Sequence, residues 1–214
     1  MKRAFVRWLG QVALGLFVCV CAFDVGNAQI VANGSFETPD IPSNSFVYDP
    51  SGASWIFTGS SGIIDSPGAA FFGPPAPDGS QYAFLQFDPM TPGVFSETIT
   101  LSLDGTYRLS YVVAGRPSNG GGAGGDLPYQ IRLDSTIVAS DATTTGQPFT
   151  ARVFDFFATS GTHTLTFETA PGASGDNTAF FDSVAIQPVP EPATAALFVS
   201  GLLAVVATAR RKNQ

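Results

Sequence analysis

The feature that most constrains the fold is a series of short alternating or apolar runs separated by clusters of Gly, Pro, Asn and Asp. Between residues 107 and 113, aromatic and aliphatic residues occupy the odd positions, while Arg108 and Ser110 lie at even positions. A half-buried antiparallel strand requires this period of two. No segment of residues 29–188 shows the period of an amphipathic helix, so we expect an all-β domain.

The same pattern places the individual elements. Strands are predicted at 54–58, 81–87, 94–103, 106–115, 129–139, 149–158, 162–169 and 179–187. About eight short strands with closely spaced turn signals favour a single jelly-roll β-sandwich over residues 29–188. Asp104-Gly105 and Ser160-Gly161 are predicted hairpin turns. The Gly-rich stretch 118–126 is a predicted loop, since no strand-to-helix context makes it a phosphate-binding turn.

The charge of this central region excludes several kinds of partner. Residues 29–192 contain four Arg, no Lys and sixteen Asp and Glu, which gives a formal charge of −12. Such a surface repels phosphate backbones and anionic lipid headgroups. We therefore expect no nucleic-acid partner and no binding through a basic membrane-surface helix.

Residues 1–28 have the layout of a secretory signal peptide. Lys2, Arg3 and Arg7 precede an uncharged apolar run at 12–23, and Gly26 and Ala28 supply the small residues of a cleavage site. The mature chain is predicted to begin at Gln29; the alternative is an N-terminal anchor, for which the run is short. Both Cys residues lie in this segment, so the mature domain is expected to contain no disulfide and no Cys metal site.

Residues 189–214 have three successive parts. Pro190, Glu191 and Pro192 precede an uncharged stretch at 193–209, and the basic residues at its end are Arg210, Arg211 and Lys212. Seventeen residues span roughly 25 Å as a helix, the short end of what crosses a bilayer. The basic end fixes the cytoplasmic side. The tail resembles the PEP-CTERM sorting signal of Gram-negative bacteria.

That resemblance implies a processing partner and a route. It implies that an exosortase recognises the tail and cleaves near the Pro-Glu-Pro motif. The protein would pass through the inner membrane transiently and reach the cell surface or extracellular space, often in cells that make exopolysaccharide. An ordinary C-terminal tail anchor is the alternative.

Four stretches between these ends resemble a second family. They occur in the order 33–37 (Asn-Gly-Ser-Phe-Glu), 79–86 (Gly-Ser-Gln-Tyr-Ala-Phe-Leu-Gln), 105–111 (Gly-Thr-Tyr-Arg-Leu-Ser-Tyr) and 176–184 (Asp-Asn-Thr-Ala-Phe-Phe-Asp-Ser-Val). Together they resemble galactose-binding-like jelly rolls, which occur among carbohydrate-binding modules. In that family the Glu of the first stretch and the Asp of the last help to hold a structural calcium.

The corresponding residues here are Glu37 and Asp182. Asp182 shares sequence parity with Phe180 and Val184, so a regular strand would point its carboxylate inward at the sandwich edge. A buried carboxylate needs a partner. Calcium, completed by backbone carbonyls near Asn33 and Ser35, would supply one. The alternative is an Asp capped by backbone amides or facing water.

A carbohydrate site needs aromatic faces and a few orienting polar groups. Gln86 and Arg116 follow apolar strand residues and could line one face together with Tyr129. A solvated Arg at a strand end is the alternative. Trp55, in an apolar strand, is predicted to be core rather than a binding platform.

Few residues of the chain are suited to catalysis. His163 is the only His in the chain and shares parity with Leu165 and Phe167, which favours a structural role. No Gly-x-Ser-x-Gly nucleophile elbow is present, and no spacing singles out a carboxylate pair. We therefore expect an exported, non-enzymatic surface or matrix protein that binds glycan. The alternatives are a structural or adhesive protein without a defined ligand, and a polysaccharide hydrolase.

Overall fold

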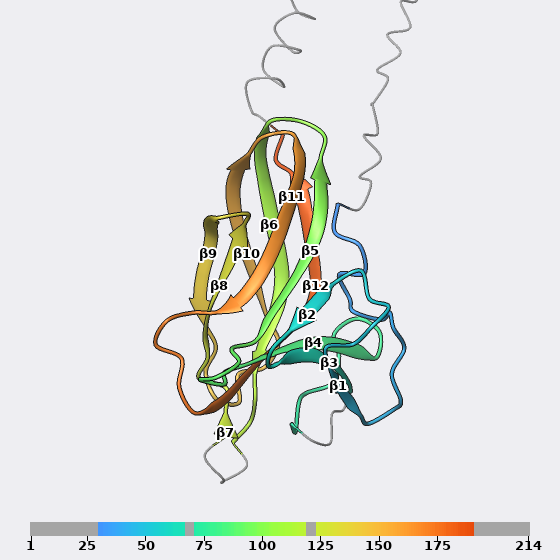
Figure 1. Ribbon diagram of the computed structural model, residues 1–214, viewed down its shortest axis with the longest axis vertical. Coiled ribbons are helices and arrows are strands. Elements are labelled where there is room, and N and C mark those ends of the chain that lie inside the picture. The colour runs from blue at the N-terminus through green and yellow to red at the C-terminus, as the bar shows by residue number, and fades with distance from the viewer. Residues whose placement is uncertain (1–29, 67–70, 119–122, 191–214) are drawn as a thin grey trace, which may run out of the picture.

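The computed structural model describes residues 30–66, 71–118 and 123–190 (Figure 1). Within these ranges every regular element is a β-strand, which confirms the predicted all-β class. The strands are β1 (Phe46–Tyr48), β2 (Ile56–Thr58), β3 (Ser61–Asp65), β4 (Gln81–Gln86), β5 (Val94–Leu101), β6 (Gly105–Gly115), β7 (Ala123–Gly124), β8 (Pro128–Leu133), β9 (Thr136–Ala142), β10 (Thr150–Ala158), β11 (Gly161–Thr169) and β12 (Asp176–Pro188). The predicted signal peptide and the tail from residue 191 lie outside the described residues.

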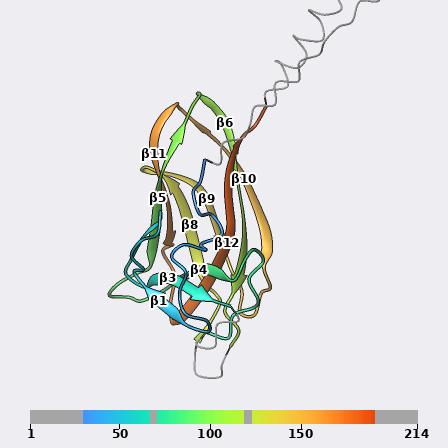
Figure 2. The same ribbon diagram turned by 90° about the vertical axis from the view of Figure 1, so that its right-hand side faces the viewer.

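The strands form two sheets that pack face to face (Figures 1 and 2). Sheet A has the order β1-β3-β4-β12-β6-β10, with the short β7 paired in parallel to the start of β12. Sheet B has the order β2-β5-β11-β8-β9. All the other pairings are antiparallel. The architecture is a β-sandwich in which the chain passes repeatedly between the sheets, as in a jelly roll.

The two turns that were predicted to form hairpins instead connect one sheet to the other, so the hairpin prediction is wrong at both. Asp104-Gly105 connects β5 of sheet B to β6 of sheet A, and Ser160-Gly161 connects β10 of sheet A to β11 of sheet B. The Asp104 carboxylate accepts a hydrogen bond of 2.6 Å from the Ser160 amide, so the two crossovers are tied together at one end of the sandwich.

Other differences from the prediction have local causes. The predicted strand 129–139 is two strands, β8 and β9, because Asp134 adopts a φ of 54° and starts a two-residue turn. Strands β1 and β3 were not predicted. A side chain at Gly62 in β3 would place its Cβ 2.0 Å from the Val47 carbonyl oxygen, so glycine is what allows β1 to approach. Because glycine has a low strand propensity, the sequence pattern did not indicate a strand here.

The sandwich interior is rich in aromatic rings. Phe95 and Phe167 stack at 4.8 Å with an interplanar angle of 10°, and Phe181 meets both rings edge-on. Trp55 lies against Phe95 and is buried, which confirms its predicted core position. Aromatic rings therefore form a large part of the buried core, together with aliphatic side chains from both sheets.

Sheet A also carries a second apolar cluster on its outer face. Its buried members are Ile64, Phe71, Tyr82, Phe84, Ala114 and Phe180. The strand alternation explains it: Ala83 and Leu85 of β4 face the interior, so Tyr82 and Phe84 face outward. A sheet that is apolar on both faces needs a cover on the second face, and the loop that carries Phe71 supplies part of it.

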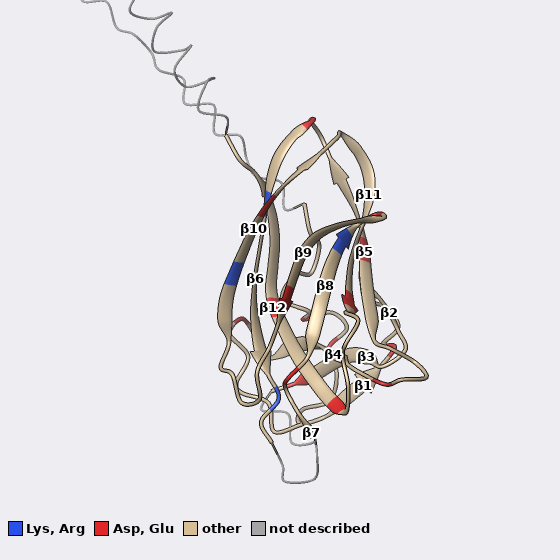
Figure 3. Ribbon diagram, turned by 90° about the vertical axis from the view of Figure 1, so that its left-hand side faces the viewer, with Lys and Arg blue, Asp and Glu red and all other residues tan. Residues whose placement is uncertain are grey.

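Charged positions are sparse over the strands, and acidic ones outnumber basic ones (Figure 3). Each of the four Arg in the described residues forms an ion pair; the pairs are Arg108–Asp155, Arg116–Asp176, Arg132–Glu168 and Arg152–Asp141. The described surface therefore presents no unpaired Arg to an anionic partner.

Candidate functional site

The outer face of sheet A holds the most distinctive group of side chains. Tyr48 of β1 lies opposite Gly62 of β3, and Gly62 lies opposite Phe84 of β4. Because Gly62 has no side chain, the Tyr48 ring meets the Phe84 ring directly, with centroids 5.0 Å apart. Phe46, two residues before Tyr48, packs against Phe71 at 4.9 Å. Four aromatic rings thus meet over β1, β3 and β4.

Polar groups border these rings where β4 ends and β12 begins. Asp176, the first residue of β12, accepts hydrogen bonds on the same carboxylate oxygen from Gln86 Nε2 and, at 3.2 Å, from Arg116 Nη1. Gln86 in turn accepts a hydrogen bond of 2.6 Å from the Tyr48 hydroxyl. The backbone holds this arrangement in place, because Gln86 lies opposite Thr178 and the Arg116 amide donates to the Thr178 carbonyl at 3.0 Å.

One further contact closes the group into a circle. The guanidinium carbon of Arg116 lies 4.8 Å from the centroid of the Phe71 ring, a cation–π arrangement. The circle therefore runs through six side chains in contact order: Tyr48, Gln86, Asp176, Arg116, Phe71 and Phe46. We call these six residues the Asp176 site. It combines aromatic rings with an amide and a carboxylate, the groups that orient a polar ligand with apolar faces.

The members of the Asp176 site differ in exposure in a way that suits binding. The side chain of Arg116 is 6% exposed, whereas that of Asp176 is 53% exposed. Phe46 and Tyr48 are 38% and 40% exposed. Burial, with the nearby Asp176 carboxylate adding to it, raises the pKa of the Tyr48 hydroxyl, which keeps it a hydrogen-bond donor.

Two buried polar atoms beneath the site have no hydrogen-bond partner within the described residues. They are Arg116 Nε and Thr178 Oγ1. Buried polar atoms without partners are rare in folded proteins and point to water or a ligand nearby. Thr178 pairs with Gln86, and the Arg116 amide donates to the Thr178 carbonyl, so two of the four such atoms in the described residues lie at this site; the other two belong to Tyr82 and Glu97.

Phe72 adds an exposed aromatic residue next to Phe71. Its ring is 58% exposed and its φ is 55°, in the left-handed region that a non-glycine residue rarely adopts. Backbone strain of this kind is concentrated at functional sites. Phe72 therefore adds an exposed aromatic side chain and a strained backbone next to Phe71 in the sequence.

The structure brings together two of the three residues predicted to bind a ligand. Gln86 and Arg116 both contact Asp176, and Arg116 is buried rather than solvated. Tyr129 does not join them. It is fully buried in the sandwich interior, where its hydroxyl lies 3.0 Å from that of Tyr111. The expectation that Tyr129 shares their face is wrong, because its strand β8 belongs to sheet B.

The two residues of the predicted calcium site, Glu37 and Asp182, approach the same turn from two sides. One oxygen of Glu37 accepts hydrogen bonds from the amides of Ser80 and Gln81, at 3.0 and 2.8 Å. Asp182 accepts hydrogen bonds from the amides of Asp78, at 3.0 Å, and Ser183, at 2.5 Å, which is the capping by backbone amides given above as the alternative to calcium. Gly79, between the capped amides of Asp78 and Ser80, has a φ of 73°, and a Cβ there would lie 2.3 Å from the Glu37 carboxyl carbon, so this position favours glycine.

Asp182 is fully buried, but the strand-parity argument for it is wrong. Asp182 and Phe180 lie on the outer side of β12, whereas Val184 and Ile186 face the interior. A β-bulge after Asp182, with Ser183 at a φ of 54°, reverses the alternation. The bulge is held by a hydrogen bond of 2.8 Å from the Val184 amide to the Gly34 carbonyl.

The electrostatics of Asp182 fit a cation only in part. Burial raises the pKa of Asp182 to about 7, and the nearby carboxylates of Asp78 and Glu37 add to the shift. No ion pair in the described residues involves Asp182. However, the described residues contain no group of three or more His, Cys, Asp or Glu that could hold a metal.

The backbone carbonyls that would complete a calcium site are partly engaged as well. The Asn33 carbonyl already accepts hydrogen bonds from the Phe36 amide, at 3.0 Å, and from the Trp55 indole, at 3.2 Å. A calcium ion would therefore have to use Glu37, Asp182 and other backbone oxygens. Oxygen donors of this kind match the chemistry of calcium.

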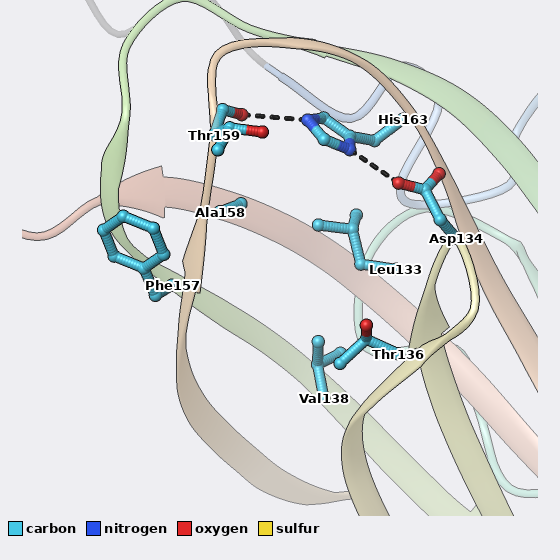
Figure 4. Close-up of a pocket in the computed structure, with 8 residues that line it drawn as sticks. All are labelled: Leu133, Asp134, Thr136, Val138, Phe157, Ala158, Thr159 and His163. Carbon is cyan, nitrogen blue, oxygen red and sulfur yellow. Dashed lines mark hydrogen bonds and ion pairs between the residues drawn. The ribbon is translucent and has the colours of Figure 1, made fainter.

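A small pocket lies at the other end of the sandwich, between the edge strands β9 and β10 (Figure 4). It measures about 220 Å³, and Phe157, Val138 and Leu133 form its apolar walls. His163 bridges its rim, with Nδ1 2.8 Å from Asp134 and Nε2 2.9 Å from the Thr159 carbonyl.

Both ring nitrogens of His163 therefore face hydrogen-bond acceptors. The bond to Asp134 is the main cause that raises the pKa of His163. Its role is to tie two turns together, in agreement with the predicted structural role. We regard the pocket as secondary to the Asp176 site.

The predicted sorting residues Glu191, Pro192, Arg210, Arg211 and Lys212 lie outside the described residues. Pro190 is the last described residue and follows β12. In the described part of the chain, no helix is long and apolar enough to cross a membrane.

Comparisons with known proteins concern the fold. No protein-family model and no curated protein matches the chain. Among solved structures, the chain is similar to the K1 cleaved adhesin domain of Lys-gingipain from Porphyromonas gingivalis W83 (14% identity, 70% of this chain and 97% of that chain covered, TM-score 0.47). It is also similar to two carbohydrate-binding modules, TmCBM61 in complex with beta-1,4-galactotriose (13%, 75% and 99%, 0.45) and a CBM4 (16%, 75% and 100%, 0.45).

Proposed function

We propose that the domain binds glycan without catalysis, at the Asp176 site. The observation that carries the proposal is the closed circle of contacts, in which partly exposed rings adjoin an exposed carboxylate held by a buried Arg. Sugars present apolar C–H faces that stack on aromatic rings and hydroxyls that donate to carboxylates. The circle supplies one carboxylate, Asp176, whereas glycoside hydrolysis uses two that flank the sugar.

The position of the site supports a role at a surface. Strand β12 starts at Asp176 and runs for 13 residues to Pro188, about 40 Å at the rise of an extended strand. The chain leaves the sandwich at that far end (Figure 2). A domain attached through its C-terminal tail would therefore present the Asp176 site away from the point of attachment.

We further propose the route to that surface from the sequence. Residues 1–28 direct export, and an exosortase recognises the tail and cleaves near Pro190, Glu191 and Pro192. The protein then acts at the cell surface or in an extracellular polysaccharide. A structural calcium at Glu37 and Asp182 is also proposed; its support is that the buried Asp182 carboxylate has backbone amides but no cationic side chain as partners within the described residues.

A glycan array probed with the mature exported protein tests the binding proposal. We expect binding to at least one glycan, and loss of that binding in Asp176→Ala. The matched control is Ile56→Ala, which removes an exposed apolar side chain from the edge of sheet B. No binding to any glycan would favour the structural or adhesive alternative, and release of reducing ends from a bound polymer would favour a hydrolase.

A further inference from the structure

The geometry of the exposed rings restricts the shape of the ligand. The two exposed rings, Phe46 and Tyr48, meet at an interplanar angle of 87°. A crystalline polysaccharide presents a flat face, which needs several coplanar rings to stack against it. Perpendicular rings instead form a corner, where one sugar stacks on one ring while its neighbour turns away. The Asp176 site therefore suits a single chain rather than a flat crystal face.

The charges around the site restrict the ligand further. Tyr48 lies within electrostatic range of two carboxylates, Asp176 and Asp88, and of one cation, Arg116. The Arg116 guanidinium is buried and already bonded to Asp176. The exposed charge of the site is therefore negative. No Lys is available to offset this charge, because the sequence between residues 30 and 190 contains none. Like charges at an interface oppose binding, so an anionic sugar is disfavoured.

The hydrogen-bonding groups of the site favour a ligand that donates hydrogen bonds. Both bonds that hold Asp176 end on Oδ1, and more than half of its side chain is exposed. The carboxylate is therefore available to accept hydrogen bonds from neighbouring hydroxyls of a sugar. Hydrogen bonds to a charged carboxylate are shorter and stronger than hydrogen bonds between neutral groups. An uncharged polyhydroxyl chain meets all three requirements of shape, charge and donor groups.

We propose that the Asp176 site binds a single soluble chain of uncharged sugars, and neither a crystalline polysaccharide nor a polyuronate. This inference rests on the proposed glycan binding and names its ligand class. It assigns specificity to two features: the perpendicular pair of Phe46 and Tyr48, and the negative charge that Asp88 adds beside the circle.

The experiment compares three kinds of polymer with the mature exported protein. Affinity electrophoresis is run in gels that contain soluble neutral glucans, galactans or mannans, or alginate or polygalacturonate. Sedimentation with microcrystalline cellulose and chitin completes the set. We expect retardation by at least one neutral soluble polymer, loss of that retardation in Tyr48→Ala, and no retention by the anionic or crystalline polymers.

A charge variant outside the circle provides the matched control. Asp88→Asn preserves the cap that Asp88 forms on the amides of Met90 and Thr91, at 2.7 and 3.2 Å, but removes a negative charge. It should leave retardation by the neutral polymer unchanged and reduce the discrimination against polyuronate.

The outcomes separate the two claims. Retention by cellulose, chitin or a polyuronate that is lost in Tyr48→Ala would overturn the ligand class and leave glycan binding standing. An absence of retention by every polymer would overturn the proposed glycan binding, and the ligand class with it.

Discussion

Arg116 and Asp176 form an ion pair whose two ends lie in different environments. The guanidinium is 6% exposed and rests on the Phe71 ring, while the carboxylate is 53% exposed. The buried Arg116 guanidinium thereby holds the exposed Asp176 carboxylate in position. A fixed acceptor beside aromatic rings loses little conformational freedom when a ligand binds, which is the advantage of a preorganised site.

Removing Asp176 should destabilise the domain because it leaves the buried Arg116 charge without its partner. For Asp176→Ala we expect a loss of about 1–3 kcal/mol in the free energy of unfolding, measured by urea denaturation. Adding Arg116→Met to Asp176→Ala should restore part of the loss, since no buried charge then remains. A double variant less stable than Asp176→Ala would contradict this reading of the pair.

Trp55 should prove structural. Its indole packs on Phe36 and Phe95, at 5.3 and 5.5 Å, and donates to the Asn33 carbonyl. Trp55→Ala should cost about 3–5 kcal/mol in the free energy of unfolding. The adjacent Ile56 is 64% exposed, so Ile56→Ala should change stability by less than about 0.5 kcal/mol. Equal melting temperatures for Trp55→Ala and the unaltered protein would show that the ring is not needed in the core.

The sequence predicted the core better than the connections. Alternation correctly placed Tyr107, Leu109 and Tyr111 toward the interior, because the period of two is a property of the strand itself. It could not show that Asp104-Gly105 changes sheets, because a crossover and a hairpin use the same turn residues. It also failed beyond Asp182, where the bulge at Ser183 gives no glycine signal.

The candidate site was predictable only in part, for a related reason. Gln86 and Arg116 end apolar strands, so their polar character was visible in the sequence. Their shared partner Asp176 lies 60 positions beyond Arg116, and no local pattern connects the two. The aromatic members on β1 were missed together with that strand, whose pairing depends on the absence of a side chain at Gly62.

Asp182 should make stability depend on both pH and calcium. Its pKa in the folded state is about 7, above the usual value of 3.8, so the folded state binds the extra proton. In EDTA, the contribution of Asp182 should therefore make the free energy of unfolding fall as pH rises from about 4 to 7. Glu97, a second buried carboxyl with a pKa raised to about 7, adds a slope of the same sign.

Asp182→Asn isolates the contribution of Asp182, since Glu97 is common to both proteins. The variant should lose part of the pH slope in EDTA. At pH 8, calcium at about 100 times its dissociation constant should add roughly 2.7 kcal/mol to the unaltered protein and nothing to the variant. Parallel pH curves for the two proteins, with no effect of calcium on either, would reject the proposed site.

The tail should behave as a processed sorting signal. Proline has no backbone N–H to donate, so we expect neither a helix nor a sheet to extend through the segment with prolines at 190 and 192, and we expect a processing enzyme to bind it. Changing Pro190, Glu191 and Pro192 to Ala should leave export intact but trap the full-length protein in the inner membrane. Mass spectrometry of the surface fraction decides: an intact segment 193–214 on the mature protein would indicate a permanent tail anchor.

The central claim is that the rings and the carboxylate of the Asp176 site bind sugar together. Isothermal titration of the best neutral oligosaccharide into the unaltered protein, Tyr48→Ala and Ile56→Ala tests it most directly. Loss of one stacking ring should weaken binding by about tenfold or more in Tyr48→Ala, equivalent to about 1.4 kcal/mol, and leave Ile56→Ala unchanged. Equal dissociation constants for all three proteins would contradict the account, because the sugar would then bind elsewhere.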